Sequence, residues 1–356
     1  MKFLFNQDAS KLYDFLKFPK LLYKEIYDEL IQIDDYIDKE YEGLFVSYSD
    51  RLSPYAKDIT LFYTKNIFDA DFIEQIVTKD KLLTYTNPQV FLDYLLDLSN
   101  NEIKQMFVKS LLKHEKDKPN INEVISDILS SNEKIMALIN DLPIDSAVKW
   151  NLYMIMQEPA KYLNVYVKLL REVYPLFLDY YHHFETKIIT YGKFLENFLN
   201  EKGSIGLEEI THSLLNKSLV LDDHNDLLIS CIFPYSISFF DLPDGRIIVW
   251  GLHVEEASKK LKENYDNRLN NRIQVFKNLG DKTRYEVLKL ISKGITATKD
   301  IANELNVSSA TISYHLNALL AAKLIKISTS NRKFSYEVDF DVINEVFKEL
   351  ITDLQS

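Results

Sequence analysis

The segment 308–316 reads Ser-Ser-Ala-Thr-Ile-Ser-Tyr-His-Leu and gathers short hydroxyl side chains, a tyrosine and a histidine at the start of a predicted helix. Ile312, Leu316 and Leu319 recur at helical spacing and give that helix one apolar face. Hydroxyl groups at the N-terminal end of such a helix can hydrogen-bond to base edges and phosphate oxygens. We therefore expect DNA contacts from its first two turns, namely from Ser308 (the N-cap), Ser309, Thr311, Ser313, Tyr314 and His315. For His315 the alternative is a role in fixing the helix.

The elements around this segment predict a winged helix-turn-helix. A short apolar-faced helix at 298–305 precedes the turn Asn306-Val307, and the recognition helix spans 308–322. Two strands follow within 325–338 and form the wing, with a polar tip between them. In this fold the second helix enters the DNA major groove. We expect Arg332 and Lys333, at the tip, to contact the backbone or the minor groove, the alternative being a solvated turn.

Two runs of sequence carry a resemblance to a known family. The run 276–288 (Phe-Lys-Asn-Leu-Gly-Asp-Lys-Thr-Arg-Tyr-Glu-Val-Leu) resembles the first helices of ArsR-family transcriptional repressors. The pattern Ala-x-x-Leu-x-Val-Ser-x-x-Thr-Ile-Ser-x-His-Leu at 302–316 continues the match. The resemblance covers roughly residues 260–345. It implies a homodimeric repressor that releases its operator when an effector arrives.

The resemblance also implies where the dimer forms. In the family the helices before and after the winged core build the interface, and these correspond to 257–279 and 342–355 here. The apolar residues that could supply it are Ile273, Phe276, Val342, Ile343, Val346, Phe347 and Leu350.

Charge supports a nucleic-acid role independently of the motif. Residues 272–336 carry eleven Lys and Arg against four Asp and Glu, whereas the rest of the chain carries 31 basic and 49 acidic residues. Cationic side chains bind duplex DNA by releasing its condensed counterions, and an acidic surface is repelled by it. We therefore expect double-stranded DNA to bind the C-terminal part alone. A solvated basic surface is the alternative.

A metal cofactor is not expected. The resemblance implies that a cysteine motif would fall at Ala297 and Lys299, and neither side chain is a soft ligand. The last helix holds no histidine, so the family's second metal site is unsupported too. His182 and His183 are adjacent and point about a third of a turn apart, so a partly buried helix face explains them better than a shared ion. Cys231 lies in an apolar run and is expected to pack as a small hydrophobe.

The composition predicts a mainly α-helical chain of two or three domains. Hydrophobic residues make up 46% of the 356 residues, while Gly and Pro occur only eight and nine times. The single cysteine fits a reducing cytoplasm. We find no long apolar run, and the apolar core of the first eight residues is too short for a signal peptide, so no membrane contact is expected. No catalytic motif rises above chance, and an enzyme is not expected.

Three domains are expected. Residues 1–215 read as a series of helices, with starts at Ser53, Asn87, Asn120 and Asp145, and Pro175 should end or kink a long helix near Tyr174. Residues 216–254 read as a short antiparallel β-meander with strands at 218–221, 227–232, 236–240 and 246–250. Residues 255–356 hold the winged helix-turn-helix and the dimer helices.

These features predict a DNA-binding transcriptional regulator, with repression implied by the resemblance. The large helical part must sense or recruit something, and its many Tyr and Phe residues favour a small organic effector or a protein partner within 1–254. Two alternatives stay open at this point. The winged domain could bind protein instead of DNA, or an enzymatic site could lie in the helical domain.

Overall fold

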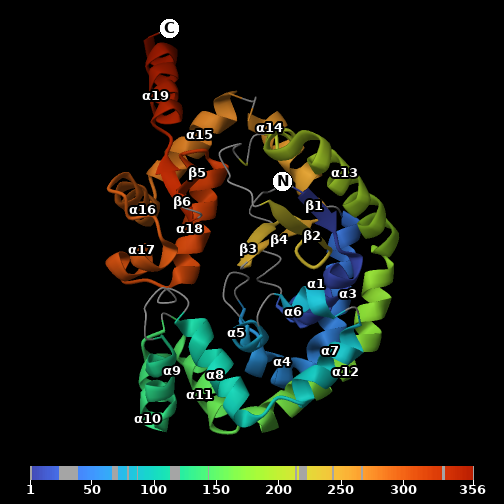
Figure 1. Cartoon of the computed structure of the whole chain (residues 1–356). Coiled ribbons are helices and arrows are strands. Elements are labelled where there is room, and N and C mark those ends of the chain that lie inside the picture. The colour runs from blue at the N-terminus through green and yellow to red at the C-terminus, as the bar shows by residue number, and fades with distance from the viewer. Residues whose placement is uncertain are drawn as a thin grey trace.

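Helices dominate the chain, and two separate apolar clusters organise them. The computed structural model describes residues 2–355 except 24–38, 66–70, 78–79, 86, 113–120, 143, 213–214, 216–222, 243, 266–267 and 331–332. One cluster runs from Phe3 to Val254 and the other from Val275 to Val346. In Figure 1 the helices of the first part curve around a small sheet, and the winged part lies to one side. The predicted mainly α-helical class is confirmed.

The first part begins with one strand, and a long series of helices follows. These helices are α1 (Gln7–Lys17), η1 (Phe18–Leu22), α3 (Lys39–Leu52), η2 (Ser53–Tyr55), α4 (Ala56–Phe62), α5 (Phe72–Ile76), α6 (Lys81–Thr84), α7 (Pro88–Leu96), α8 (Asn100–Leu111), α9 (Ile121–Leu129), α10 (Asn132–Asn140), α11 (Ser146–Gln157), α12 (Pro159–His182) and α13 (Glu185–Ile210). Among the described residues, none of the helices is long and apolar enough to span a bilayer.

The predicted helix starts are mostly confirmed. The Asn87 side chain accepts from the Gln89 amide at 2.8 Å and caps α7, and Asp145 stands immediately before α11. Ser53 begins a short 3-10 helix, η2, instead of an α-helix. Asn120 lies outside the described residues, and α9 begins at the next position.

Pro175 does not end its helix, so of the two predicted outcomes, an end or a kink near Tyr174, the first is wrong. The proline lies inside α12, and the chain breaks eight residues later, at His183 and Phe184. A proline inside a helix costs about 3 kcal/mol. Val173, Phe177 and Tyr180 on either side are fully buried, and burying each such side chain contributes about 1.5–3 kcal/mol. Packing therefore outweighs the lost hydrogen bond.

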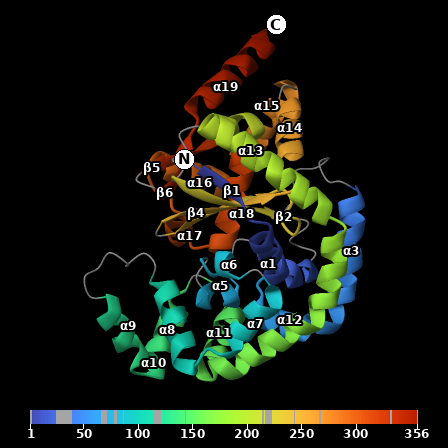
Figure 2. The same ribbon diagram turned by 45° about the vertical axis from the view of Figure 1, so that its right-hand side comes forward.

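A four-stranded mixed sheet lies inside the curve of helices. Its strands are β1 (Lys2–Phe5), β2 (His224–Ser230), β3 (Ile237–Leu242) and β4 (Gly245–Gly251), in the spatial order β1-β2-β4-β3. The β3–β4 pair is an antiparallel hairpin as predicted, but β2 runs parallel to both β1 and β4. Figure 2 shows α13 on one face of the sheet and α1 on the other.

The predicted antiparallel meander is therefore wrong for β2. Its partner β1 comes from the other end of the unit and was not among the predicted strands, and the predicted strand at 218–221 lies outside the described residues. The continuous apolar run Leu227-Leu228-Ile229 is typical of a strand buried on both faces, and all three residues are fully buried. That run favours a parallel central strand, whereas the turn-forming residues around it favoured local pairing.

The outer edge of β1 is closed by a side chain of α13. The Phe3 amide donates to Asn200 Oδ1 at 2.9 Å, and Asn200 Nδ2 donates to the Phe3 carbonyl at 2.8 Å. The amide group thus takes the place of a neighbouring strand for one residue. Gly192, further back on α13, allows close approach, because a Cβ there would lie 2.4 Å from the Phe5 ring.

A buried carboxyl joins α1 to the end of β2. Asp14 accepts hydrogen bonds from the Ser230 hydroxyl at 2.5 Å and the Cys231 amide at 2.9 Å. The Cys231 thiol, fully buried as expected, donates to the same carboxyl at 3.2 Å. Burial raises the pKa of Asp14 to about 6 even though these three donors lower it.

This pKa predicts a pH-dependent stability. Because the folded-state pKa of Asp14, about 6, lies above the ordinary 3.8, the native state binds the proton more tightly than the unfolded state. The stabilisation of the fold by protonated Asp14 is therefore fully present below about pH 4. It is lost as the pH rises through about 6, which lowers the free energy of unfolding by about 3 kcal/mol. Asp14→Asn should approach the wild type in free energy of unfolding at low pH and exceed it near neutrality.

Urea titrations at several pH values measure the difference in free energy of unfolding between Asp14→Asn and the wild type. Asp8→Asn, at an exposed position of the same helix, is the control and should follow the wild type throughout. Parallel pH profiles for Asp14→Asn and the wild type would show that Asp14 does not titrate in this range.

Candidate nucleic-acid interface

The second apolar cluster holds the helix-turn-helix. Its elements are α15 (Arg268–Leu279), α16 (Lys282–Ser292), α17 (Thr298–Leu305), α18 (Ser309–Ala321), β5 (Ile325–Ser330), β6 (Lys333–Val338) and α19 (Phe340–Gln355). Helix α14 (Val254–Tyr265) precedes them, and its Val254 belongs to the first cluster. The predicted helix at 298–305, recognition helix and two-stranded wing are thus all present. In Figure 1, α19 projects away from the rest of the winged part.

The turn between α17 and α18 depends on two polar residues. Asn306 ends α17 in the left-handed conformation with φ 56°, which asparagine tolerates better than most residues. Ser308 then caps α18, because its hydroxyl accepts from the Thr311 amide at 3.0 Å. The two hydroxyl oxygens of Ser308 and Thr311 also lie 2.8 Å apart. The cap that the sequence predicts is confirmed.

The faces of α18 separate as its periodicity predicts. Ile312, Leu316 and Leu319 are at most 1% exposed and form the inner face. The hydroxyl-bearing residues lie on the other sides: Ser308 is exposed, and Ser309, Thr311, Ser313 and Tyr314 are half-buried. The helix can therefore offer hydroxyl groups to a groove while its apolar side holds it to the domain.

His315 differs from the other predicted contact residues. Its side chain is buried, with 8% exposed, and its Nδ1 has no hydrogen-bond partner among the described residues. Burial lowers the pKa of its imidazole, which Asp281 opposes and Arg284 reinforces. This geometry favours the role of fixing the helix, and a DNA contact from His315 stays a prediction.

Arg284, on α16, is a functional candidate that the sequence prediction missed. Its Nη2 donates to the Tyr314 hydroxyl at 3.1 Å and its Nη1 to Asn278 Oδ1 at 3.0 Å. The guanidinium carbon also lies 5.5 Å from the centre of the Tyr314 ring. These partners are 30 and six residues away along the chain, so no local pattern marks Arg284.

The wing is an antiparallel pair as predicted. Ile325 lies opposite Val338 and Ser330 opposite Lys333, and the hydroxyls of Ser328 and Ser335 are 2.8 Å apart across the ribbon. Lys333 begins β6, whereas Arg332 lies outside the described residues. The DNA contacts expected from these two side chains stay predictions.

Known proteins resemble this part of the chain. The helix-turn-helix domain family matches residues 279–327. The transcriptional repressor SdpR of Bacillus subtilis is 34% identical over 71 residues, which is 79% of that protein and 20% of this chain. The chain belongs to the ArsR family of helix-turn-helix transcriptional regulators.

Two further relatives cover the same C-terminal part of this ArsR-family chain. The arsenical resistance operon repressor of Bacillus subtilis is 29% identical over 97 residues, 86% of its length and 27% of this chain. An uncharacterized HTH-type regulator of Methanocaldococcus jannaschii is 38% identical over 77 residues, 85% of its length and 21% of this chain. No solved structure matches the chain. The relatives thus say nothing of the helical part.

The metal-binding positions of the resembled family carry other residues in this ArsR-family chain. Ala297 precedes α17 as its N-cap, and Lys299 is the second residue of that helix. In the part of the chain that the structure describes, no three or more His, Cys, Asp or Glu side chains gather closely enough to hold an ion. His182 is exposed, with its Nδ1 3.8 Å from Glu185.

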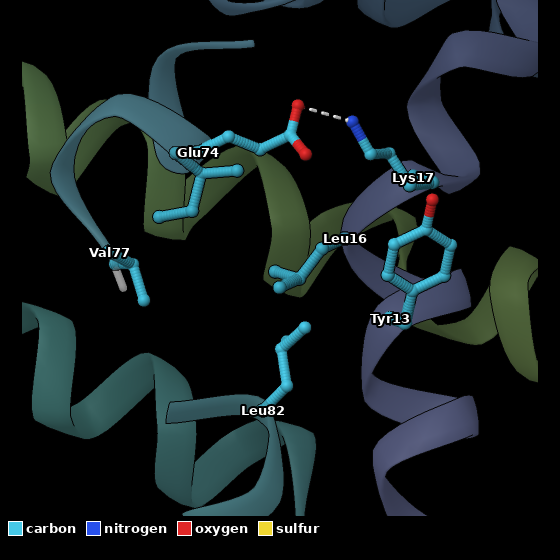
Figure 3. A pocket seen from close by; sticks show the side chains of 7 residues that line it. Tyr13, Leu16, Lys17, Glu74, Val77 and Leu82 are labelled. Carbon is cyan, nitrogen blue, oxygen red and sulfur yellow. Dashed lines mark hydrogen bonds and ion pairs between the residues drawn. The ribbon is translucent and has the colours of Figure 1, made fainter. Parts of the chain in front are cut away.

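A pocket in the helical part is a second candidate site. Its cavity volume is about 20 Å³, room for about one water molecule, and it is lined by Tyr13, Leu16, Lys17, Ile73, Glu74, Val77 and Leu82. Figure 3 shows the Lys17–Glu74 ion pair at one end and hydrocarbon side chains facing the space between α1 and α6. Lys17 Nζ lies 2.7 Å from Glu74 and 2.8 Å from Asp71. Its apolar lining with a few polar groups has the chemistry of a site for a small organic molecule, but such a ligand needs roughly 300 Å³ or more and would have to widen the cavity.

The separation of faces on α18 predicts opposite effects of two neighbouring substitutions. Ile312→Ala should lower the free energy of unfolding of the winged domain by about 2–5 kcal/mol, because it leaves a cavity under the helix. Thr311→Ala should change it by only about 0.5 kcal/mol and should alter base preference in a duplex-selection experiment. Urea unfolding measures the first effect. A destabilising Thr311→Ala beside a neutral Ile312→Ala would mean that the helix faces are reversed.

Proposed function

We propose that this chain is a homodimeric transcriptional repressor of the ArsR type that binds double-stranded DNA. The observation that carries the proposal is α18, a Ser308-capped helix that buries Ile312 and Leu316 and leaves its hydroxyl groups on the outer sides. Helix α18 would enter the major groove, and the β5–β6 wing would lie on the backbone or in the minor groove. Two relatives named as repressors support this role.

The proposed contacts divide into two kinds. The hydroxyl groups of α18 would meet base edges and phosphates, and the wing tip would meet the backbone. The residues concerned are Ser308, Ser309, Thr311, Ser313 and Tyr314 on the helix, and Arg332 and Lys333 on the wing. The basic excess of residues 272–336 on an acidic chain supports DNA as the partner over a protein.

A salt titration of duplex affinity tests the proposal. The wild type should lose affinity steeply as salt rises, and Arg332→Ala with Lys333→Ala should reduce the log–log slope by about 0.9 for each lost phosphate contact. Fluorescence anisotropy with a labelled duplex measures both. Lys161→Ala with Lys168→Ala, on the exposed surface of α12, removes the same charge from the helical part and should leave the slope unchanged.

Other outcomes would contradict the proposal in different ways. A wild-type chain that binds no duplex at low salt would favour the alternative, a winged domain that binds protein. An unchanged slope in the wing variant would show that the wing does not touch phosphates.

The dimer would form through exposed apolar faces of α15 and α19. Of the residues predicted for this interface, Ile273 and Phe347 are exposed, whereas Val346 is buried in the chain's own core and Phe276, Val342, Ile343 and Leu350 are partly buried. The rings of Phe276 and Phe347 pack edge-on at 5.6 Å and join the two helices. Helical spacing places Phe347 on one face of α19 with three further exposed residues, Phe340, Ile351 and Leu354.

A charge on this face should separate the protomers. Ile351→Glu should weaken dimerisation about 100-fold or more, because a symmetric interface loses the burial of two isoleucines at about 1.5–3 kcal/mol each. Thr352→Glu adds the same charge one position further and should leave the dimer intact. Sedimentation equilibrium measures both. A wild type that is monomeric at every concentration would rule out the dimer.

We further propose that residues 1–254, whose helices and sheet share one apolar cluster, act as the effector domain. The apolar lining of the cavity between α1, α5 and α6 supports a small organic effector that would widen this cavity on binding, and a protein partner is the alternative. Helices α14 and α15 connect this part to the helix-turn-helix and are the route for coupling. A thermal-shift screen of organic compounds against the whole chain would identify such a ligand.

A further inference from the structure

The guanidinium of Arg284 makes no ion pair with a carboxylate among the described residues. The two hydrogen-bond partners of its side chain, Asn278 and Tyr314, are neutral, and the neighbouring carboxylate of Asp281 accepts from the Arg284 backbone amide at 2.8 Å instead. The Nε of Arg284 is buried and has no partner either. A structural arginine at a half-buried position usually pairs with a carboxylate, because burying an unpaired charge is costly. The charge beside α18 therefore has no direct ion-pair partner in the described part of the protein.

The hydrogen bond from Arg284 fixes what Tyr314 can do. A guanidinium has donors and no acceptor, so the Tyr314 oxygen must accept from it. The Tyr314 proton is then free to donate elsewhere, and the structure shows no other hydrogen bond of this hydroxyl among the described residues. A neighbouring cation also strengthens the hydroxyl as a donor. The group that suits this arrangement is an acceptor with negative charge.

Asn278 holds Arg284 in this orientation. The Asn278 side chain is buried, with 5% exposed, and its Nδ2 donates to the Gln274 carbonyl on α15 at 2.8 Å. Its Oδ1 therefore faces Arg284 and accepts a hydrogen bond from Arg284 Nη1 at 3.0 Å. Arg284 on α16 thus donates in two directions, to Asn278 on α15 and to the Tyr314 hydroxyl on α18.

We propose that Arg284 is a positioning residue for DNA binding, which orients the Tyr314 hydroxyl as a donor to a phosphate oxygen of the duplex. This inference rests on the proposed function of α18. The Tyr314 hydroxyl would then bind the phosphate backbone of the DNA, and Arg284 would act without touching the DNA. Because Asn278 belongs to α15, the orientation of Tyr314 also depends on the helix that follows the effector domain.

A double-mutant cycle on the full-length chain tests the proposal. The probe is a fluorescein-labelled duplex of mixed sequence at low salt. Tyr314→Phe should weaken binding about ten-fold, as expected for the loss of one hydrogen bond to a charged group. Arg284→Met should weaken it by a similar factor, yet cause little further loss in the Tyr314→Phe background.

Two further measurements separate positioning from other roles. If Arg284 only positions Tyr314, Arg284→Met should leave the log–log salt slope unchanged, whereas a direct phosphate contact would reduce it by about 0.9. Lys289→Met, at an exposed position on the same helix, is the control, and any loss that it causes should add to that of Tyr314→Phe. Thermal unfolding of each variant reports the folded fraction.

The outcomes distinguish this proposal from the function on which it rests. Additive losses for Arg284→Met and Tyr314→Phe, or a reduced slope for Arg284→Met, would overturn the positioning role and leave DNA binding by α18 in place. If neither Tyr314→Phe nor Thr311→Ala changed duplex affinity, α18 itself would not be the contacting helix.

Discussion

The helical part of the molecule depends on the parallel pairing of its first strand with a strand more than two hundred residues later. Lys2 lies opposite His224 and Phe5 opposite Leu227 in the sheet. Parallel neighbours need a crossover connection, and here all of the described helices from α1 to α13 lie within it. The sheet then buries its two faces against α1 and α13. The pairing of β1 with β2 thus brings the two ends of the helical series together. Helix α14 follows β4, the neighbour of β2 in the same sheet.

The winged part follows a different physical rule. It is small, basic and built from local contacts, and its function depends on which polar groups remain available to DNA. Burial of Ile312 and Leu316 leaves the hydroxyl side of α18 outward, and the cation of Arg284 has neutral partners among the described residues. Partly buried polar and charged groups without full hydrogen-bonding or ion-pair partners cost free energy in a folded protein. Their presence beside the proposed groove-binding helix is consistent with a ligand that supplies acceptors and negative charge.

The sequence predicts the winged helix-turn-helix well because its signals are local. A cap at Ser308, a turn at Asn306 and apolar residues three and four apart are each visible within a few positions. It predicts the sheet poorly, because the partner of β2 is β1, and no short-range pattern connects Phe3 with Asn225. It also left open whether Pro175 would end or kink its helix, since distant packing decides which occurs. Arg284 was missed because Tyr314 lies 30 residues away.

The side chain of Asn200 has a consequence for the order in which the chain can fold during synthesis. The strand β1 leaves the ribosome first, but its amide and carbonyl groups find their partners in Asn200, in Asp223 and in β2. Until residue 227 has been made, those groups stay hydrated and the first five residues have no sheet to join. Domains tend to fold as units in synthesis, and contacts distant in sequence form late. The first residues to be translated are thus among the last of this unit to reach their place.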